Sequence, residues 1–449
     1  MTAPSPRRRA PYAALMSSYF ISMLGTSMSQ LAIPWMVLTS TGSASKTGLV
    51  AFAEMAPYVM AQALAGPLVD RFGLRRSFVV GNILAGLATA AIPAFYAIDH
   101  LSFAVLIVLV AIIGLVRGAA DCANSALLPA TATIGQIPLE RAAGLNTSAN
   151  RTAILLGAPA AGLLVTLFGS PFVVLLDAIT FLIGAALVAI YLRHVGEPAP
   201  APAETGGIRG YGRGLAEGLR FVRGDRLILG VIIMVALMNL IDQGLSEVML
   251  PVWVRQELHS ASALGLITGI FGLGSVAGNL IGAWLGPRLP RRTAYAVGSL
   301  FGGAPRFFIL VLASTLSPVL AVELSTAIIG GSINSVIGAT FYERIPENLR
   351  ARVLGVIRAS AWVGIPFGAL FAGAATEAFG VRAALIVSGV AYTLITLPPF
   401  IFPVWRQMRR PDPAPASAPA PRPALAPGPT PTAAPGPASS DLSQTADSV

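Results

Sequence analysis

Two ionisable residues, Arg117 and Asp121, lie inside a long apolar stretch of the chain, four residues apart. That spacing places both side chains on one face of a helix, one turn from each other. A charged side chain at the centre of a membrane-spanning helix costs roughly 2.5–3.5 kcal/mol, so such residues are usually paired or face a cavity. An aspartate released from its partner can take up a proton, whereas an arginine keeps its charge. The pattern therefore fits a pair that couples protonation to opening, and it equally fits a permanent structural salt bridge.

Other ionisable residues also interrupt the apolar segments. They are Glu54, Asp177, Asp242, Glu247, Arg306, Glu323 and Arg358. Glu54 and Asp242 lie deep enough along their segments to face a cavity, whereas we expect Glu247 and Glu323 to be interfacial and solvated. The candidates for proton coupling are Arg117, Asp121, Glu54 and Asp242. The candidates for lining a substrate cavity are Glu54, Asp242 and Arg306. Carboxylates among aromatic side chains attract cations, which favours amphipathic cations as cargo.

Cysteine and histidine are too few and too scattered for a metal site. Cys122 is the only cysteine, and His100, His194 and His259 are far apart in the sequence, so we expect no metal and no disulfide. Lys46, the only lysine, lacks the upstream glycine of a phosphate-binding loop, which excludes an ATPase of that kind. Energy must then come from a gradient. No cluster of His, Asp or Ser supports a membrane-embedded enzyme, and we expect no cofactor.

Composition assigns most of the chain to lipid. Of the 449 residues, 55% are hydrophobic and 11% are charged, and the mean hydropathy is +0.73. Soluble domains are about one-quarter charged. The 30 Lys and Arg residues sit in short loops between apolar runs and form no continuous basic face, which argues against nucleic acid as a partner.

Twelve apolar runs are long enough to cross a bilayer, since a spanning helix needs about 20 residues. The first six fall near residues 12–39, 47–69, 77–97, 101–126, 144–168 and 171–192. The other six fall near residues 227–251, 263–285, 293–313, 317–340, 353–378 and 381–405. The sequence therefore predicts an all-α integral membrane protein with twelve transmembrane helices in two pseudo-symmetric six-helix bundles.

The predicted organisation has five parts. They are a cytoplasmic N-terminal tail (1–11), an N-terminal bundle (12–192), a cytoplasmic connector (193–226), a C-terminal bundle (227–405) and a disordered Pro/Ala-rich cytoplasmic tail (406–449). Placing the N-terminus in the cytoplasm puts most loop arginines inside, as the positive-inside rule requires, so both termini are predicted to be cytoplasmic. Within the connector, residues 214–226 fit an amphipathic helix on the inner leaflet or an ordinary solvated linker.

The two halves resemble each other in sequence. Residues 66–76 (GPLVDRFGLRR) are mirrored by residues 282–292 (GAWLGPRLPRR), and Ile137-Pro138 is mirrored by Ile345-Pro346. Both correspondences lie a little over 200 residues apart, which indicates a duplicated six-helix unit. The second copy lacks an equivalent of Asp70.

The segment 66–76, in the loop between helices two and three, resembles the signature loop of the major facilitator superfamily. It departs from the family pattern at Leu74, where a basic residue is usual. The resemblance implies that the segment latches the two halves on the cytoplasmic side, with Asp70 facing the positive N-terminal end of the eleventh helix, an interaction of about 0.3–1 kcal/mol. The expected gating residues are Gly66, Asp70, Arg71, Gly73, Arg75 and Arg76. Alternatively, the arginines only satisfy the positive-inside rule.

Two further features resemble proton-coupled members of the same superfamily. Arg117 is similar to an arginine that many such members carry in the fourth helix. Gly157, Pro159 and Gly162 resemble the glycine-proline motif of antiporters, although here the proline comes one residue later than usual. The motif suggests antiport, and small residues at these positions also fit plain helix packing.

The resemblance implies a proton-coupled secondary active transporter that exports hydrophobic or amphipathic small molecules, as in drug or natural-product efflux, by alternating access. Residues 126–129 (ALLP) and 144–146 (GLN) are similar to the branch with macrolide and siderophore exporters. The expected partners are a small-molecule substrate, protons and membrane lipid, for a monomer in the bacterial inner membrane. The alternative is a proton-coupled importer, or a narrow-specificity exporter of a metabolite or siderophore.

Overall fold

The computed structural model describes residues 6–193, 207–285, 288–346 and 349–408, and every regular element in these ranges is a helix. The first half contains α1 (Pro6–Thr41), α2 (Ala44–Leu64), α3 (Gly66–Phe72), α4 (Leu74–Ala97), α5 (Phe103–Ile134), α6 (Leu139–Phe168) and α7 (Ser170–Tyr191). The remainder contains α8 (Gly207–Gly224), α9 (Arg226–Gly244), the π-helix η1 (Leu245–Met249), α10 (Leu250–Glu257), α11 (Ala261–Leu285), α12 (Arg291–Phe301), α13 (Ala304–Leu312), α14 (Leu316–Arg344), α15 (Arg350–Trp362), α16 (Ile365–Phe379), α17 (Val381–Thr396), α18 (Pro398–Ile401) and the 3-10 helix η3 (Pro403–Met408).

The described helices account for the predicted membrane spans. Eleven of them, some built from consecutive elements, are long and apolar enough to cross a membrane. The pair α2 and α3, which bends by 66° at its break, is the twelfth candidate. The chain thus adopts the all-helical fold that hydropathy predicts, with eleven or twelve candidate spans.

The segment 66–76 is more ordered than the short charged turn that the sequence suggests. Its first seven residues form α3, because Gly66 and Pro67 break the chain after α2 and proline suits the first turn of a helix. Gly73 ends α3 with a φ of 87°, a conformation that favours glycine. The segment therefore leaves α2 at an angle and re-enters the bundle as α4.

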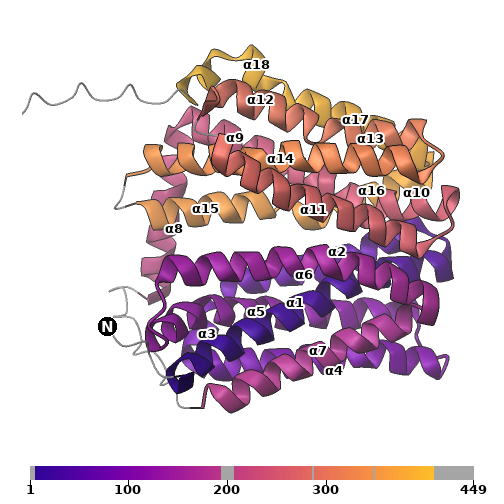
Figure 1. The fold of residues 1–449 in the computed structure, drawn as a ribbon, viewed down its shortest axis with the longest axis vertical. Helices are drawn as coiled ribbons and strands as arrows, with labels where there is room; N and C mark the ends of the chain where they lie inside the picture. The colour runs from indigo at the N-terminus through magenta and orange to yellow at the C-terminus, as the bar shows by residue number, and fades with distance from the viewer. Residues whose placement is uncertain (1–5, 194–206, 286–287, 347–348, 409–449) are drawn as a thin grey trace, which may run out of the picture. The chain divides into compact units, whose positions relative to one another are not determined.

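The helices pack as two sets that meet along two seams. Helices α1, α2, α4, α5, α6 and α7 pack on one another, and α9, η1 and α10 to α17 form the second set. The sets meet where α6 packs on α11 and where α2 packs on α16 (Figure 1). We call the end where α1 meets α2 the outer end and the end where α2 meets α3 the inner end, following the orientation that the sequence predicts.

The described part of the connector from residue 207 onward contains the helix α8, and a helix is one of the two conformations predicted for residues 214–226. Helix α8 packs on α15, where Glu217 forms an ion pair with Arg352. Val222 is buried in a cluster with residues of α9 and α15, so this apolar side chain of α8 packs on protein. The predicted contact of this helix with the inner leaflet stays a prediction, and residues 1–5 and 409–449 of the predicted tails lie outside the described residues.

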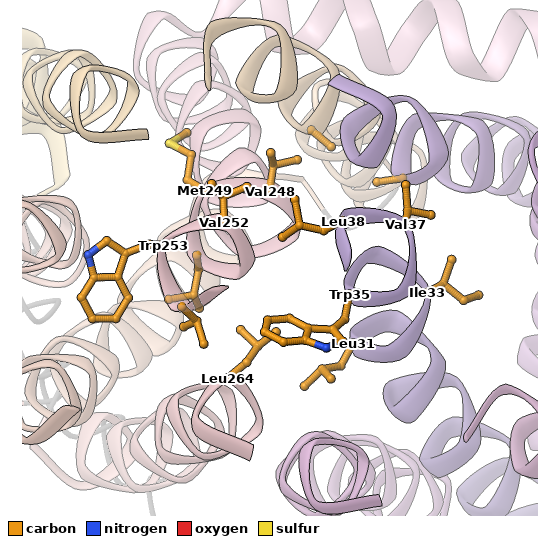
Figure 2. Packing of buried hydrophobic residues seen from close by; sticks show 14 of the residues in the cluster. Leu31, Ile33, Trp35, Val37, Leu38, Val248, Met249, Val252, Trp253 and Leu264 are labelled. Atoms are coloured by element: carbon orange, nitrogen blue, oxygen red, sulfur yellow. The ribbon is translucent and has the colours of Figure 1, made fainter. Parts of the chain in front are cut away.

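The largest hydrophobic cluster includes side chains from both sets of helices at the outer end. Leu31, Trp35 and Leu38 come from α1, and they lie with residues of η1, α10 and α11 in one buried cluster. Figure 2 shows these side chains gathered between the helices, with Val248, Met249, Val252, Trp253 and Leu264 on the side of the second set. We call this group the outer seal. Burying apolar side chains of both sets together stabilises the closed arrangement of the outer end.

Candidate functional site

The first charged group joins α2 and α5. Arg117 of α5 forms an ion pair with Glu54 of α2, with 2.9 Å between Nη1 and Oε1, and both residues are buried. One turn further along, the Tyr58 hydroxyl donates a hydrogen bond of 2.9 Å to Asp121 Oδ2 and accepts one from Gln62 Nε2. The ring of Tyr58 also lies against the guanidinium of Arg117. The side chains thus form two successive polar contacts between α2 and α5, one helical turn apart.

This geometry corrects the predicted pairing of Arg117 with Asp121. The reason lies in two glycines of α5: a Cβ atom at Gly114 would overlap the backbone oxygen of Glu54, and one at Gly118 would overlap that of Tyr58. The glycines let α2 approach closely, so Arg117 finds its partner on the neighbouring helix. Within the described residues, no cation lies within 4.0 Å of Asp121. The carboxylate is held by a hydroxyl instead of an arginine.

The second charged group lies in the C-terminal half. Arg306 of α13 pairs with Glu323 of α14 over 2.9 Å, from Nε to Oε2, and with Asp242 of α9 over 3.4 Å, from Nη1 to Oδ1. The centroid of the Phe271 ring, on α11, lies 4.1 Å from the guanidinium carbon. Arg306 is 4% exposed and Glu323 is 0% exposed. The expectation of a solvated Glu323 is therefore wrong, because the residue lies two turns inside α14 and faces Arg306.

The other buried or half-buried ionisable residues have weaker partners. Asp177 of α7 is buried and accepts a hydrogen bond of 3.3 Å from the Thr180 hydroxyl. Glu247 of η1 is half-buried and accepts one of 3.1 Å from Gln243, so it is less solvated than the sequence suggested. Arg358 is exposed on α15.

A cavity of about 350 Å³ lies beside the second charged group. Two of the three predicted cavity residues, Asp242 and Arg306, line it, whereas Glu54 lines a different cavity. Arg151 of α6 contributes from the N-terminal half, and sequence reasoning missed it because it lies in an ordinary polar helical turn. The remaining polar side chains of the wall are Asn239, Ser275, Tyr295, Asn279, Ser299, Thr326, Asn334 and Tyr392. The wall therefore offers many hydrogen-bonding groups besides the aromatic ring of Phe271.

Within the described residues, no hydrogen bond or ion pair joins the gating residues predicted in 66–76 to the second set of helices. Asp70, Arg71 and Arg76 are exposed, and within the described residues no hydrogen bond or ion pair reaches them. Arg75 Nη2 donates a hydrogen bond of 2.8 Å to the Ala189 carbonyl of α7, inside the first set. The contact predicted for Asp70 at the inner end is therefore not formed among the described residues.

At the outer end, a carboxylate from the second set caps the N-terminus of α2. Glu377 Oε2, near the end of α16, accepts hydrogen bonds from the backbone N–H groups of Ala44, at 2.8 Å, and Ser45, at 3.3 Å. The Ser43 hydroxyl donates a third one, of 3.1 Å. A carboxylate in this position satisfies free N–H groups and faces the positive end of the helix dipole. The contact joins the two sets of helices.

A guanidinium makes the reciprocal contact beside it. Arg255 Nη1, on α10, donates a hydrogen bond of 2.6 Å to the Leu38 carbonyl in the last turns of α1. A cation suits the negative C-terminal end of a helix. The Glu377 and Arg255 contacts flank Gly42, which turns the chain from α1 to α2 with a φ of 70°. We call these two contacts the outer latch.

The glycine-proline motif of Gly157, Pro159 and Gly162 lies on α6, and its last two residues lie in the seam between α6 and α11. A Cβ atom at Gly162 would come within 3.0 Å of the Cα of Gly265, and one at Gly265 would come within 2.5 Å of the Ala158 carbonyl oxygen. Pro159 faces Gly269, and Gly157 faces Ser27 of α1. The motif therefore packs helices closely, which is the structural interpretation of its small residues.

Replacing Gly265 with leucine should destabilise the closed outer end, because a side chain has no room between α6 and α11. Overpacking of this kind costs about 1–3 kcal/mol. We expect a lower thermal midpoint of the purified protein and a loss of transport. Gly355→Leu is the matched control, since a Cβ there meets nothing within 4 Å. Equal thermal midpoints for Gly265→Leu and Gly355→Leu would contradict the close packing of α6 on α11.

Sequence reasoning missed the residues whose partners lie on distant helices. Glu377 lies close to the end of its helix, where a carboxylate is expected to be solvated. Arg255 belongs to no sequence motif that would have marked it as functional. Glu323 was recognisable in one respect: Arg306, buried in an apolar run, needs an acidic partner. The repeated glycines and serines at equivalent places, Ser43 with Ser260 and Gly48 with Gly265, were a further indication that α2 and α11 play matching roles.

Comparison with known proteins gives one family and several relatives. Residues 15–247 and 232–442 match the family described as Major Facilitator Superfamily. The chain is 29% identical over 409 residues to the multidrug efflux pump Tap of Mycobacterium tuberculosis (strain ATCC 25618 / H37Rv), covering 89% of this chain and 95% of that protein. It is 25% identical over 411 residues to the multidrug efflux pump Tap of Mycolicibacterium fortuitum, covering 89% of this chain and 98% of that protein.

Solved structures share the fold. A bacterial homolog of the human lysosomal transporter Spinster, inward-facing and unoccupied, superimposes with a TM-score of 0.68 at 14% identity, covering 92% of this chain and 100% of the other. The nucleoside transporter NupG superimposes with a TM-score of 0.63 at 12% identity, covering 87% of this chain and 99% of the other. At these identities the likeness concerns the fold alone.

Proposed function

The chain belongs to the major facilitator superfamily, and we propose that it exports hydrophobic or amphipathic small molecules in exchange for protons, by alternating access. The curated relatives with 25–29% identity are named multidrug efflux pumps, which supports export of foreign or natural compounds. We further propose that the protein works as a monomer in the bacterial inner membrane, with both termini in the cytoplasm and two six-helix bundles joined by the connector 193–226.

The observation that carries alternating access is the unequal state of the two ends. The outer end is closed by the outer seal and by the outer latch, in which Glu377 and Arg255 reach across to α2 and α1. At the inner end, Asp70 has no partner among the described residues. A transporter that exposes one side at a time needs contacts of this kind at one end and free groups at the other.

The coupling proposal rests on the group between α2 and α5. Glu54 is engaged by Arg117, whereas Asp121 is held only by the Tyr58 hydroxyl among the described residues. A hydroxyl can donate a hydrogen bond to a carboxylate and accept one from a carboxylic acid. Asp121 can therefore change its protonation state without leaving a cation unpaired. Arg117 keeps its charge in either state. We therefore assign Asp121 to the transfer of the coupling proton and Arg117 to its positioning.

The cargo site that we propose is the cavity beside Arg306. Asp242 has a side chain that is 32% exposed, so it is the accessible acidic group of that cluster, and Phe271 offers an aromatic face. An amphipathic cation gains from both. The amide and hydroxyl groups of the wall favour cargo that also carries hydrogen-bonding groups. This last feature equally supports the second candidate, a narrow-specificity exporter of one polar metabolite or siderophore.

Replacing Asp121 with asparagine should remove proton dependence while leaving cargo binding nearly intact. Asparagine keeps an acceptor for Tyr58 and removes the titratable group. We expect transport that no longer responds to an imposed pH gradient, with cargo affinity within about threefold of the parent, a difference of about 0.7 kcal/mol. The measurement is transport at several external pH values together with cargo binding to the purified protein. A parent-like pH response would exclude Asp121 as the proton carrier.

The test of the function is accumulation of fluorescent amphipathic cations and macrolide-like compounds in efflux-deficient bacteria that produce the protein. We expect lower accumulation than in cells without it, and a return to the control level after a protonophore. Protein verified in the membrane without any effect over a broad panel would favour the narrow-specificity candidate. Higher accumulation that the protonophore abolishes would indicate import.

A further inference from the structure

Two carboxylates from opposite halves line one small cavity under the outer seal. Glu54 comes from α2 and Glu247 from η1, and the cavity between their elements measures about 10 Å³. That is close to the roughly 10–15 Å³ that one water molecule needs. The other lining residues are Gln30, Ile33, Pro34, Val50, Ala51 and Met55, which bring amides and apolar groups and no cation. The two acidic groups therefore border the same small cavity.

The two carboxylates have different partners. Glu54 has the guanidinium of Arg117 at 2.9 Å on its other side. Glu247 accepts a hydrogen bond of 3.1 Å from Gln243 Nε2, and within the described residues no cation lies within 4.0 Å of it. Two ionised carboxylates beside a single arginine leave a net negative charge in a space poor in water, which is costly. One proton shared by the pair makes the three groups neutral together.

The backbone at Glu247 is also unusual. Residues Leu245–Met249 form a π-helix between α9 and α10, and single π turns inside α-helices occur often at functional sites. Three residues of this turn, Leu245, Val248 and Met249, are buried in the cluster that contains the outer seal. Glu247 is thus fixed to the part of the second set that must separate from α1 and α2 when the outer end opens.

The charged groups of the other elements packed on η1 are engaged elsewhere. Asp242 of α9 forms an ion pair with Arg306, and Arg382 of α17 forms one with Glu257. Arg255 of α10 donates to the Leu38 carbonyl, and Glu377 of α16 caps the N-terminus of α2. Helix α1 contributes Gln30 to the cavity, and α2 contributes Glu54. Glu54, with Arg117 behind it, is therefore the charged group that faces Glu247.

We propose that Glu247 is the proton-binding residue of the outer gate and shares one proton with Glu54 while the outer end is closed. When the outer end opens, η1 moves away from α2, water reaches Glu247, and its O–H bond breaks to release the proton. Closing takes one proton up from the outer solution onto a carboxylate oxygen of the pair. Through Glu54 and Arg117, the gate is linked to the coupling group that contains Asp121. The inference rests on the proposed alternating access.

The test is the distance across the outer end as a function of pH. Spin labels at His100→Cys and Ser314→Cys, in a Cys122→Ser background, report it from two exposed loops, one on each half. For each proton linked to closure, the ratio of closed to open protein changes about tenfold per pH unit. We expect the closed population of the parent to rise as the pH falls, and Glu247→Gln to lose one such tenfold step per unit.

Two control variants make the result specific. Glu247→Asp keeps a titratable group and should restore the pH response. Glu257→Gln removes a carboxylate that pairs with Arg382 within the second set, at the same end, and should respond to pH as the parent does. A parent-like slope in Glu247→Gln overturns the inference and leaves the proposed export intact. A pH-linked distance that depends on Glu247, in a protein that exports nothing, supports the inference and overturns the proposed function.

Discussion

Replacing Glu323 with leucine should cause the largest loss of stability of any single change at the charged groups. It removes the 2.9 Å partner of a guanidinium that is 4% exposed and leaves Arg306 with Asp242 at 3.4 Å alone. Breaking a buried ion pair by removing one partner costs roughly 3–5 kcal/mol, because the remaining charge stays uncompensated. We expect a strongly lowered thermal midpoint in detergent and little transport in cells.

A double variant separates stability from function. Arg306→Met combined with Glu323→Leu removes the buried pair, and an apolar pair in the same space is often as stable as a buried ion pair. Asp242 loses its cation as well, but its side chain is 32% exposed and lines the cavity, where water can hydrate it. We therefore expect the double variant to recover most of the lost midpoint while transport stays absent, because Arg306 lines the proposed cargo cavity. Glu257→Gln breaks a more exposed pair and should cost about 0–1 kcal/mol. If the double variant instead lost as much stability as the two single variants together, the interaction between Arg306 and Glu323 would be contradicted.

The second large effect concerns the balance between the two ends of the protein. Glu377→Ala removes the cap that joins α16 to α2, and losing a helix cap costs about 0.5–2 kcal/mol, or about two- to thirtyfold in a ratio of states. We expect the closed fraction of the outer end to fall accordingly. Asp70→Asn should act in the opposite direction, because Asp70 has no partner in the outer-closed state and its predicted contact with the eleventh helix belongs to the other state.

The same pair of spin labels, at positions 100 and 314, measures both shifts. Transport should fall in both variants, since each one favours a single state, while the thermal midpoints stay near that of the parent. Glu257→Gln again serves as the control, because it lies at the outer end and its ion pair stays within the second set of helices. Shifts of the same sign in Glu377→Ala and Asp70→Asn would contradict the assignment of the two residues to opposite ends of one cycle.

The course of the chain through the membrane was predictable, because lipid forces each span to satisfy its own backbone within a long apolar helix. The two halves were also recognisable, because they left matching residues in the sequence. The candidate residues Arg117, Asp121, Glu54, Asp242 and Arg306 were found because a charge inside an apolar run is rare and needs a reason. Each of them lies in one of the two charged groups.

The partners of these residues were not predictable from one sequence. Spacing along a helix suggested that Arg117 pairs with Asp121, whereas the pair is with Glu54, on a helix whose approach depends on Gly114 and Gly118. Contacts such as that of Glu377 with Ala44 join residues that are 333 positions apart. Such contacts depend on how two helices slide and rotate against each other, which local patterns do not encode.

The central claim is that proton movement in one direction drives cargo in the other, and transport into vesicles tests it most directly. Purified protein is reconstituted into liposomes with an acidic lumen, and uptake of a permanently charged cation that the cell assay identifies as cargo is followed with and without an ionophore that collapses the pH gradient. We predict accumulation in the lumen that requires the gradient, is absent from protein-free vesicles, and is lost in Asp121→Asn. Accumulation only when the lumen is alkaline, or uptake that ignores the gradient, would contradict proton-coupled export.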